Sequence, residues 1–160
     1  MNICMAIHML ATNRAIYLGA MDPHDLAQRV VATMFDRDPF SRWLGIERLA
    51  VAPGRCVLSM AVRDEMLNGF AIAHGGIAYS LADSALAFAS NSHGVRSVSI
   101  ETSITHMRPV HSGDTLTATT TEKNRSTRFA TYEVIVTDQL ARTVALFKGT
   151  VFRTGEEWVV

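Results

Sequence analysis

The chain has 160 residues, a length typical of one domain and sufficient to bury a substantial core. Its 15 basic residues balance its 15 acidic residues, which argues against nucleic-acid binding because that function normally needs a strongly basic face. No run of about 18 apolar residues predicts a membrane span. The two cysteines, Cys4 and Cys56, lack zinc-site spacing and form no disulfide framework, which favours a reducing, cytoplasmic setting.

The first 20 residues differ from the remainder of the chain. They are mildly apolar and rich in Met, show no clean periodicity, and lack the positively charged start of a secretory signal. Met21 could begin a complete domain. We therefore expect a poorly defined N-terminal extension over residues 1–21 and a single domain over residues 22–160.

The domain is predicted to begin with a helix. Asp22 is a suitable N-cap and Pro23 suits the first helical position. Apolar residues then recur at helical spacing, which predicts an amphipathic helix from about His24 to Phe35. Asp38-Pro39 is expected to end it, and a strand is expected from about Leu44 to Ala52.

The following residues predict a hairpin and a second helix. Pro53-Gly54 is a turn signal, and the strand after it, from about Arg55 to Arg63, alternates between two faces. Its apolar face consists of Cys56, Leu58, Met60 and Val62. A long helix rich in Ala and Leu is then expected from about Gly75 to Asn91, before the polar residues 91–94.

The last third of the chain predicts about four strands. In the first of them, one face is formed by Val98, Ile100, Thr102 and Ile104, and the wetter face by Ser99, Glu101, Ser103 and Thr105. The other three strands are expected at Thr115 to Glu122, Phe129 to Thr137 and Thr143 to Arg153. Short connections indicate antiparallel pairing, because a parallel pair needs a crossover of about a dozen residues. One long apolar helix facing one antiparallel sheet predicts an α+β hotdog fold, in which the sheet wraps the helix.

Asp83 is the unusual residue of the long helix. Its neighbours on the helical wheel include no basic residue; they are Tyr79, Ser80, Leu86, Ala87 and Ser90. Burying an unpaired carboxylate is unfavourable and tends to raise its pKa. Such groups are kept mostly where they accept hydrogen bonds or perform chemistry. Asp83 is therefore a candidate catalytic acid, and the alternative is that it caps a neighbouring loop or faces water.

The start of the same helix is the second candidate feature. His74-Gly75-Gly76 places two residues without side chains at the first turn, where a ligand can approach the backbone. The N–H groups of a first turn have no partners within the helix and lie at the positive end of its dipole. They could stabilise the oxyanion formed when a thioester or ester is attacked. Alternatively, the glycines only permit a tight turn or close packing.

The spacing of these two features predicts a dimer. Gly76 and Asp83 are seven residues apart, which is about 10 Å along an α-helix. One substrate carbonyl cannot contact both groups on the same helix. If both belong to one site, two antiparallel central helices must each contribute one end, at a dimer interface.

Several motifs in this order resemble the PaaI-type (phenylacetic acid degradation) branch of the hotdog thioesterases. They are Leu67-Asn68-Gly69, His74-Gly75-Gly76, Ser80-Leu81-Ala82-Asp83, Arg108-Pro109 and Gly113-Asp114. The resemblance extends from about Phe40 to Arg153. It implies a coenzyme A thioester as substrate, no metal or cofactor, and a tetramer made of two dimers.

The resemblance also implies roles for individual residues. Asp83 would be the carboxylate that acts on the thioester or on water, as nucleophile or as general base, and the sequence leaves both open. The backbone N–H of Gly76, together with that of Gly75, would polarise the thioester carbonyl. Asn68 would hold the attacking water or orient the site. His74 would contact the carbonyl region or lock the loop as a hydrogen-bonded turn residue.

The substrate-binding residues are less sharply indicated. Ser99 matches a position where related enzymes place a hydroxyl near the catalytic acid. The phosphates of coenzyme A need positive groups, and Arg125, Ser126 and Arg128 lie in a predicted turn where side chains can reach a ligand. An ordinary solvated turn is the alternative for these three residues.

The predicted function is therefore hydrolysis of aryl-, phenylacetyl- or short-to-medium-chain acyl-coenzyme A to free acid and coenzyme A. One alternative is a hotdog enoyl-thioester hydratase or dehydratase, which pairs a His with an acid across a dimer. The other is an acyl-coenzyme A-binding module without catalysis, in which Asp83 would be dispensable.

Overall fold

The computed structural model of the chain describes residues 21–160, so the predicted extension over residues 1–21 lies outside the described residues except for Met21. In chain order, the elements are α2 (Pro23–Asp36), α3 (Pro39–Leu44), β1 (Glu47–Ala52), β2 (Arg55–Ala61), the 3₁₀ helix η1 (Asp64–Met66), α4 (Gly75–Asn91), β3 (Val95–His106), β4 (Thr115–Arg125), β5 (Phe129–Thr137) and β6 (Thr143–Glu157). None of the helices in residues 21–160 has the length and apolar character needed to cross a membrane.

The first helix forms as predicted and is followed by one that was not predicted. The Asp22 side chain accepts hydrogen bonds from the N–H groups of the first turn of α2. Asp38 caps α3 in the same way, and Gly45 ends that helix with φ 75°. The expectation that Asp38-Pro39 only ends a helix and that a strand begins at Leu44 was wrong. Asp-Pro starts a helix here too, and Leu44 is the last residue of α3.

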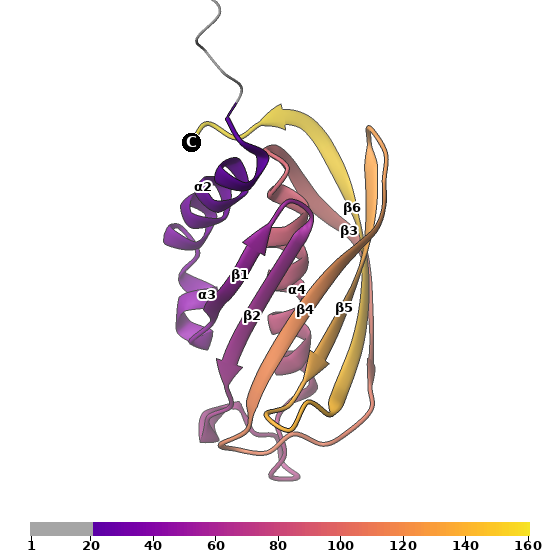
Figure 1. The fold of residues 1–160 in the computed structure, drawn as a ribbon. Coiled ribbons are helices and arrows are strands. Elements are labelled where there is room, and N and C mark those ends of the chain that lie inside the picture. Colours follow the sequence, from indigo (N-terminus) through magenta and orange to yellow (C-terminus); the bar gives the residue numbers. More distant parts are fainter. Residues whose placement is uncertain (1–20) are drawn as a thin grey trace, which may run out of the picture.

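The strands form one antiparallel sheet, in the order β1-β2-β4-β5-β6-β3. Figure 1 shows this sheet curving around α4, with α2 and α3 lying together next to β1. The predicted α+β hotdog fold is confirmed: one long helix is wrapped by one antiparallel sheet. β1 and β3 are the two edges of the sheet, so each has one side without a strand partner among residues 21–160.

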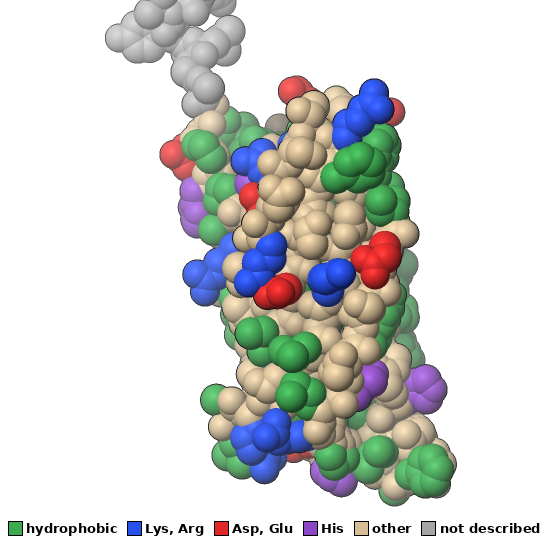
Figure 2. Space-filling model, turned by 90° about the vertical axis from the view of Figure 1, so that its right-hand side faces the viewer, with side chains coloured by type: hydrophobic (Ala, Val, Ile, Leu, Met, Phe, Trp, Pro, Cys, Tyr) green, Lys and Arg blue, Asp and Glu red, His purple; other side chains and the backbone are tan. Residues whose placement is uncertain are grey.

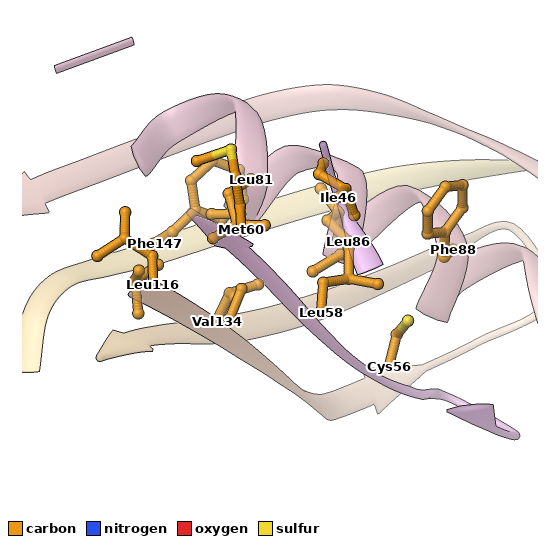
Figure 3. Close-up of a cluster of buried hydrophobic side chains, with 14 of the residues drawn as sticks. Ile46, Cys56, Leu58, Met60, Leu81, Leu86, Phe88, Leu116, Val134 and Phe147 are labelled. Carbon is orange, nitrogen blue, oxygen red and sulfur yellow. The ribbon is translucent and has the colours of Figure 1, made fainter. Parts of the chain in front are cut away.

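The core lies between α4 and the concave face of the sheet (Figure 3). Leu81 and Leu86 of α4 are fully buried, and Phe88 packs edge-to-face on Phe35 of α2 with ring centroids 6.1 Å apart. The predicted apolar face of β2 is confirmed, since Cys56, Leu58, Met60 and Val62 are at most 2% exposed. Gly149 of β6 leaves room for the Leu86 side chain, because a Cβ at Gly149 would overlap that side chain. This packing fixes α4 along its length.

A β-bulge changes the predicted faces of β3. Its pairing with β6 shifts register between Ser99 and Glu101. Ser99 lies opposite Val151, which is 1% exposed on the side of the sheet facing α4, whereas Val98 lies opposite Phe152. Directly opposed residues share a face. The prediction that Val98 shares a face with Thr102 and Ile104 was therefore wrong, because the extra residue in the bulge reverses the alternation at this point.

Candidate active site

Two cavities adjoin α4, and four of the five predicted catalytic residues line one or the other of them. One, of about 410 Å³, lies at the start of α4 and is lined by Asn68, Ile72, Ala73, His74, Gly75, Ala78, His106, Met107, Arg108, Pro109, Val110 and Leu116. The other, of about 480 Å³, lies beside the middle of α4 and is lined by Met34, Arg37, Asp38, Phe40, Tyr79, Ser80, Asp83, Ser84, Ala87, Phe88, Arg96 and Trp158. Asp83 is thus in a different cavity from Asn68, His74 and Gly75.

His74 is the N-cap of α4. Its ring nitrogen Nδ1 accepts a hydrogen bond of 3.0 Å from the Gly76 N–H, and its carbonyl accepts one of 2.8 Å from Ile77. The Gly75 N–H donates to no group within residues 21–160. Of the two predicted oxyanion donors, the Gly76 N–H is therefore already bonded, and the Gly75 N–H remains available in the cavity.

Asn68 lies in the loop between η1 and α4, at the edge of the same cavity. Its side-chain oxygen accepts a 2.8 Å hydrogen bond from the Phe70 N–H, and its own N–H donates to the Ile72 carbonyl over 2.8 Å. Because the oxygen is engaged, the side-chain NH₂ group is the part that remains able to donate. The loop is held to its surroundings by further backbone bonds, including one of 2.7 Å from Ala73 to Val110.

Asp83 has no ion pair or hydrogen bond through its side chain within residues 21–160. It is half-buried on α4, and burial raises the pKa of its carboxyl above the ordinary value of 3.8. A carboxylate with a raised pKa is a better proton acceptor near neutral pH than an ordinary surface acid. This environment suits a general base and also an attacking carboxylate.

The predicted substrate-binding residues lie away from the start of α4. Ser99 faces the α4 side of the sheet but is exposed, because it lies on the edge strand β3. The other three residues lie at the β4–β5 hairpin. Arg125 pairs with Glu122 over 3.2 Å, Ser126 bonds the Phe129 backbone, and Arg128 is exposed. Within one chain, none of the four lines either cavity.

His106, at the end of β3, was missed as a site residue. Its Nε2 atom lies 3.1 Å from where a Cβ on Gly75 would be, and it lines the same cavity as Gly75. A signal for it exists in the sequence. Continuing the alternation of Thr102 and Ile104 by two residues places His106 on the side facing α4, which its pairing with buried Ala145 confirms.

The chain is similar to known proteins in sequence and in fold. Residues 70–145 match the model of the Thioesterase superfamily. The chain is 38% identical over 122 residues to acyl-coenzyme A thioesterase PaaI of Escherichia coli K12, an alignment that covers 76% of this chain and 87% of that protein.

Solved structures show the same relationship. The E. coli PaaI structure superposes with a TM-score of 0.83 at 35% identity, covering 85% of this chain and 99% of that one. The smu.793 protein of Streptococcus mutans UA159, solved bound to acetyl CoA, superposes with a TM-score of 0.69 at 28% identity, covering 71% of this chain and 91% of that one. On this sequence identity and shared fold, the chain belongs to the Thioesterase superfamily, in its PaaI-type branch of hotdog thioester hydrolases.

Proposed function

We propose that residues 22–160 form one catalytic domain and that the protein hydrolyses acyl-coenzyme A thioesters. The active site would be built from two copies of this domain. The observation that carries this is the placement of two groups that have no partner among the described residues 21–160: the half-buried acid Asp83 lines one cavity, and the Gly75 N–H at the start of α4 lies at the other. Acyl-coenzyme A as the substrate class is supported by the E. coli relative's activity and by the acetyl CoA bound to the S. mutans protein.

A second copy of the chain would bring the two halves together. β3 is an edge strand, and Val98 and Ile100 on it are 55% and 56% exposed. A strand with free backbone groups and exposed apolar side chains is suited to pairing with another strand. If two β3 edges meet about a twofold axis, the two α4 helices run antiparallel, and Asp83 of each copy approaches the start of α4 of the other.

The part of the outer face of the sheet that β4 forms is a less suitable place for this pairing. On β4 it presents Thr117, Thr119 and Thr121, which alternate with buried residues, and nearby Lys123 pairs with Glu133 over 2.7 Å. Figure 2 shows this side of the molecule, where uncharged polar groups and scattered charges occupy the middle of the face and hydrophobic side chains gather along its right-hand edge. We place the active dimer at the β3 edge, and we expect two such dimers to form a tetramer, as the family resemblance implies.

The chemistry proceeds from this arrangement. The carboxylate of Asp83 from one copy takes a proton from water while the water oxygen bonds to the thioester carbon, and the carbonyl electron pair moves onto oxygen. The Gly75 N–H of the other copy donates to that oxyanion, and the Asn68 NH₂ group positions the water. The C–S bond then breaks, and the thiolate takes the proton held by Asp83. His74 holds the loop through the hydrogen bond that its Nδ1 accepts from the Gly76 N–H.

Attack by Asp83 itself is the other route, through a mixed anhydride that water then hydrolyses. Both routes use the same groups and yield the same products. A single turnover in ¹⁸O-labelled water tests the nucleophilic route. If Asp83 is the nucleophile and water attacks the anhydride at the Asp83 carboxyl carbon, the first acid released carries an unlabelled oxygen from the protein and Asp83 gains the label. If Asp83 is the base, the acid carries the label and Asp83 gains none.

The two ends of the substrate have different requirements. The apolar part of the Asp83 cavity, formed by Met34, Phe40, Tyr79 and Phe88, suits an aryl or short-to-medium alkyl acyl group. We assign the coenzyme A phosphates to Arg125, Ser126 and Arg128, with Ser99 near the acid. The hairpin that carries the arginines lies near the C-terminal end of α4, where Glu122 bonds His93 over 2.7 Å. An antiparallel partner helix would begin at that end.

We expect the protein to act in the cytoplasm.

The test is a panel of aryl-, phenylacetyl- and alkyl-coenzyme A substrates, read by release of free thiol. A hydratase would instead change the absorbance of an enoyl thioester without releasing thiol. A binding module would bind acyl-coenzyme A without turnover. Thiol release that requires Asp83 supports the proposed hydrolysis; either of the other two results would overturn it.

A further inference from the structure

His106 and the start of α4 form a pair that the PaaI-type motifs do not include. The ring of His106 lies over Gly75, with its Nε2, Cε1 and Cδ2 atoms 3.1, 3.5 and 3.7 Å from the position of a Cβ on that glycine. No hydrogen bond or ion pair within residues 21–160 uses the ring. The ring is exposed to the cavity shared with Asn68 and Gly75, so its nitrogen is free to bind a ligand there.

The distances allow His106 and Gly75 to bind one oxygen atom together. A Cβ position lies about 2.5 Å from the nitrogen of its own residue. Added to the 3.1 Å from Nε2, this places Nε2 at most about 5.6 Å from the Gly75 nitrogen. Two donors that each lie about 2.9 Å from a shared oxygen can be up to about 5.8 Å apart. The separation of the two nitrogens is therefore within the range that one shared oxyanion spans.

The two glycines differ in what they face. A Cβ on Gly76 would lie 3.1 Å from Nδ1 of His74, whereas a Cβ on Gly75 would lie 3.1 Å from Nε2 of His106. His74 uses its nitrogen as an acceptor for the Gly76 N–H, so neither group of that pair is available to a substrate. The ring of His106 has no such partner within residues 21–160. The site thus loses one backbone donor to the cap, and His106 adds a side-chain nitrogen beside the remaining backbone donor, the Gly75 N–H.

We propose that His106 is a catalytic residue that donates its Nε2–H to the thioester carbonyl oxygen, together with the Gly75 N–H. The proposal rests on the thioesterase function proposed above. As water attacks the carbonyl carbon, the electron pair of the C=O bond moves onto oxygen, and the two N–H groups stabilise that charge. When the C–S bond breaks, the pair returns to re-form the carbonyl. His106 donates a hydrogen bond throughout and transfers no proton.

The test compares four variants of the full-length protein with a good acyl-coenzyme A substrate from the panel. His106→Phe removes the donor. His106→Gln places an amide NH₂ near the position of Nε2, and His106→Asn places one near Nδ1 instead. His111→Phe is the matched control, because His111 is an exposed histidine on the following loop that lines neither cavity. Thermal melting and the oligomeric state are measured for each variant.

We expect His106→Phe to lower kcat by about 100- to 1,000-fold, the effect of losing one oxyanion donor, with KM nearly unchanged. His106→Gln should recover at least about tenfold of that loss, while His106→Asn should not, and His111→Phe should match the wild type. The Gln and Asn pair keeps the test decisive if the Phe variant misfolds. A wild-type kcat in His106→Phe, a change confined to KM, or equal activity of the Gln and Asn variants would overturn the proposal. Absence of turnover in the wild type would instead refute the thioesterase function itself.

Discussion

Mixed dimers provide the sharpest test of a site shared between two copies. Asp83→Asn removes the acid, and Gly75→Pro removes the free N–H while keeping a residue that suits the first position of a helix. Gly75 and Asp83 are eight residues apart on α4, about 12 Å at about 1.5 Å per residue, and line different cavities. One carbonyl cannot contact both, so a functional site must combine Asp83 of one copy with Gly75 of the other.

The expected activity follows from counting intact sites. Each variant alone should lose at least about 100-fold in kcat, because it lacks either the acid or a donor in every site. In an equal mixture that associates at random, about half of the dimers contain one copy of each variant. Each such dimer has one site with both defects and one site with none. The mixture should therefore recover about a quarter of the wild-type activity.

The assay is thiol release from acyl-coenzyme A after co-expression of the two variants, with the separately purified proteins mixed without exchange as the control. The same quarter is expected for a tetramer, provided that each site lies within one dimer. Activity of the co-expressed mixture no greater than that of the variants alone would refute the shared site. Full activity of either variant alone would refute the role of its residue.

Four further results are expected. Since burial raises the pKa of Asp83, turnover should be lost as pH falls through a midpoint above 3.8, measured by the pH profile of kcat/KM. The pKa of Asp83 is higher in the folded state than in the unfolded state, so the charged acid destabilises the fold at higher pH. Asp83→Asn should therefore raise Tm at pH 7 and leave it unchanged below about pH 3.8. A lower Tm at pH 7 would contradict this. Leu86→Ala should reduce the free energy of unfolding by about 2–5 kcal/mol in urea titrations, because the Leu86 side chain of α4 is fully buried against Gly149 of β6. A loss below about 1 kcal/mol would contradict this packing. Burial raises the pKa of Cys56 to about 12, so a Cys4→Ser variant should react with iodoacetamide at pH 8 only after unfolding.

The sequence was sufficient to predict the elements that depend only on local chemistry and periodicity. The bounds of α4 were predicted as observed, because the glycines at its start and the polar residues after Asn91 define both ends. The antiparallel sheet followed from short connections, which allow little else. α3 was missed although its signal was present, since Asp38-Pro39 repeats the start seen at Asp22-Pro23. That omission was an error of interpretation rather than a limit of the sequence.

The faces of β3 were decided by tertiary structure. A bulge arises from how two strands pair, so the pattern of β3 alone could not show that Ser99 faces α4 while Val98 faces away. Pairing with β6 also fixes His106 beside Gly75, from a position 31 residues further along the chain. Strand register is a property of two segments and their packing, not of either segment alone.

The site shows the same division. The sequence by itself determined that Asp83 is an isolated acid on an apolar helix and that the helix begins with two glycines, because both facts depend only on neighbouring residues. Only the tertiary structure decided how the polar groups are used. His74 accepts a hydrogen bond from the Gly76 N–H, the Gly75 N–H beside His106 has no acceptor within the described part of the chain, and Asp83 lines a separate cavity. Hydrogen bonds and burial depend on groups brought together by folding, so no local pattern could assign them.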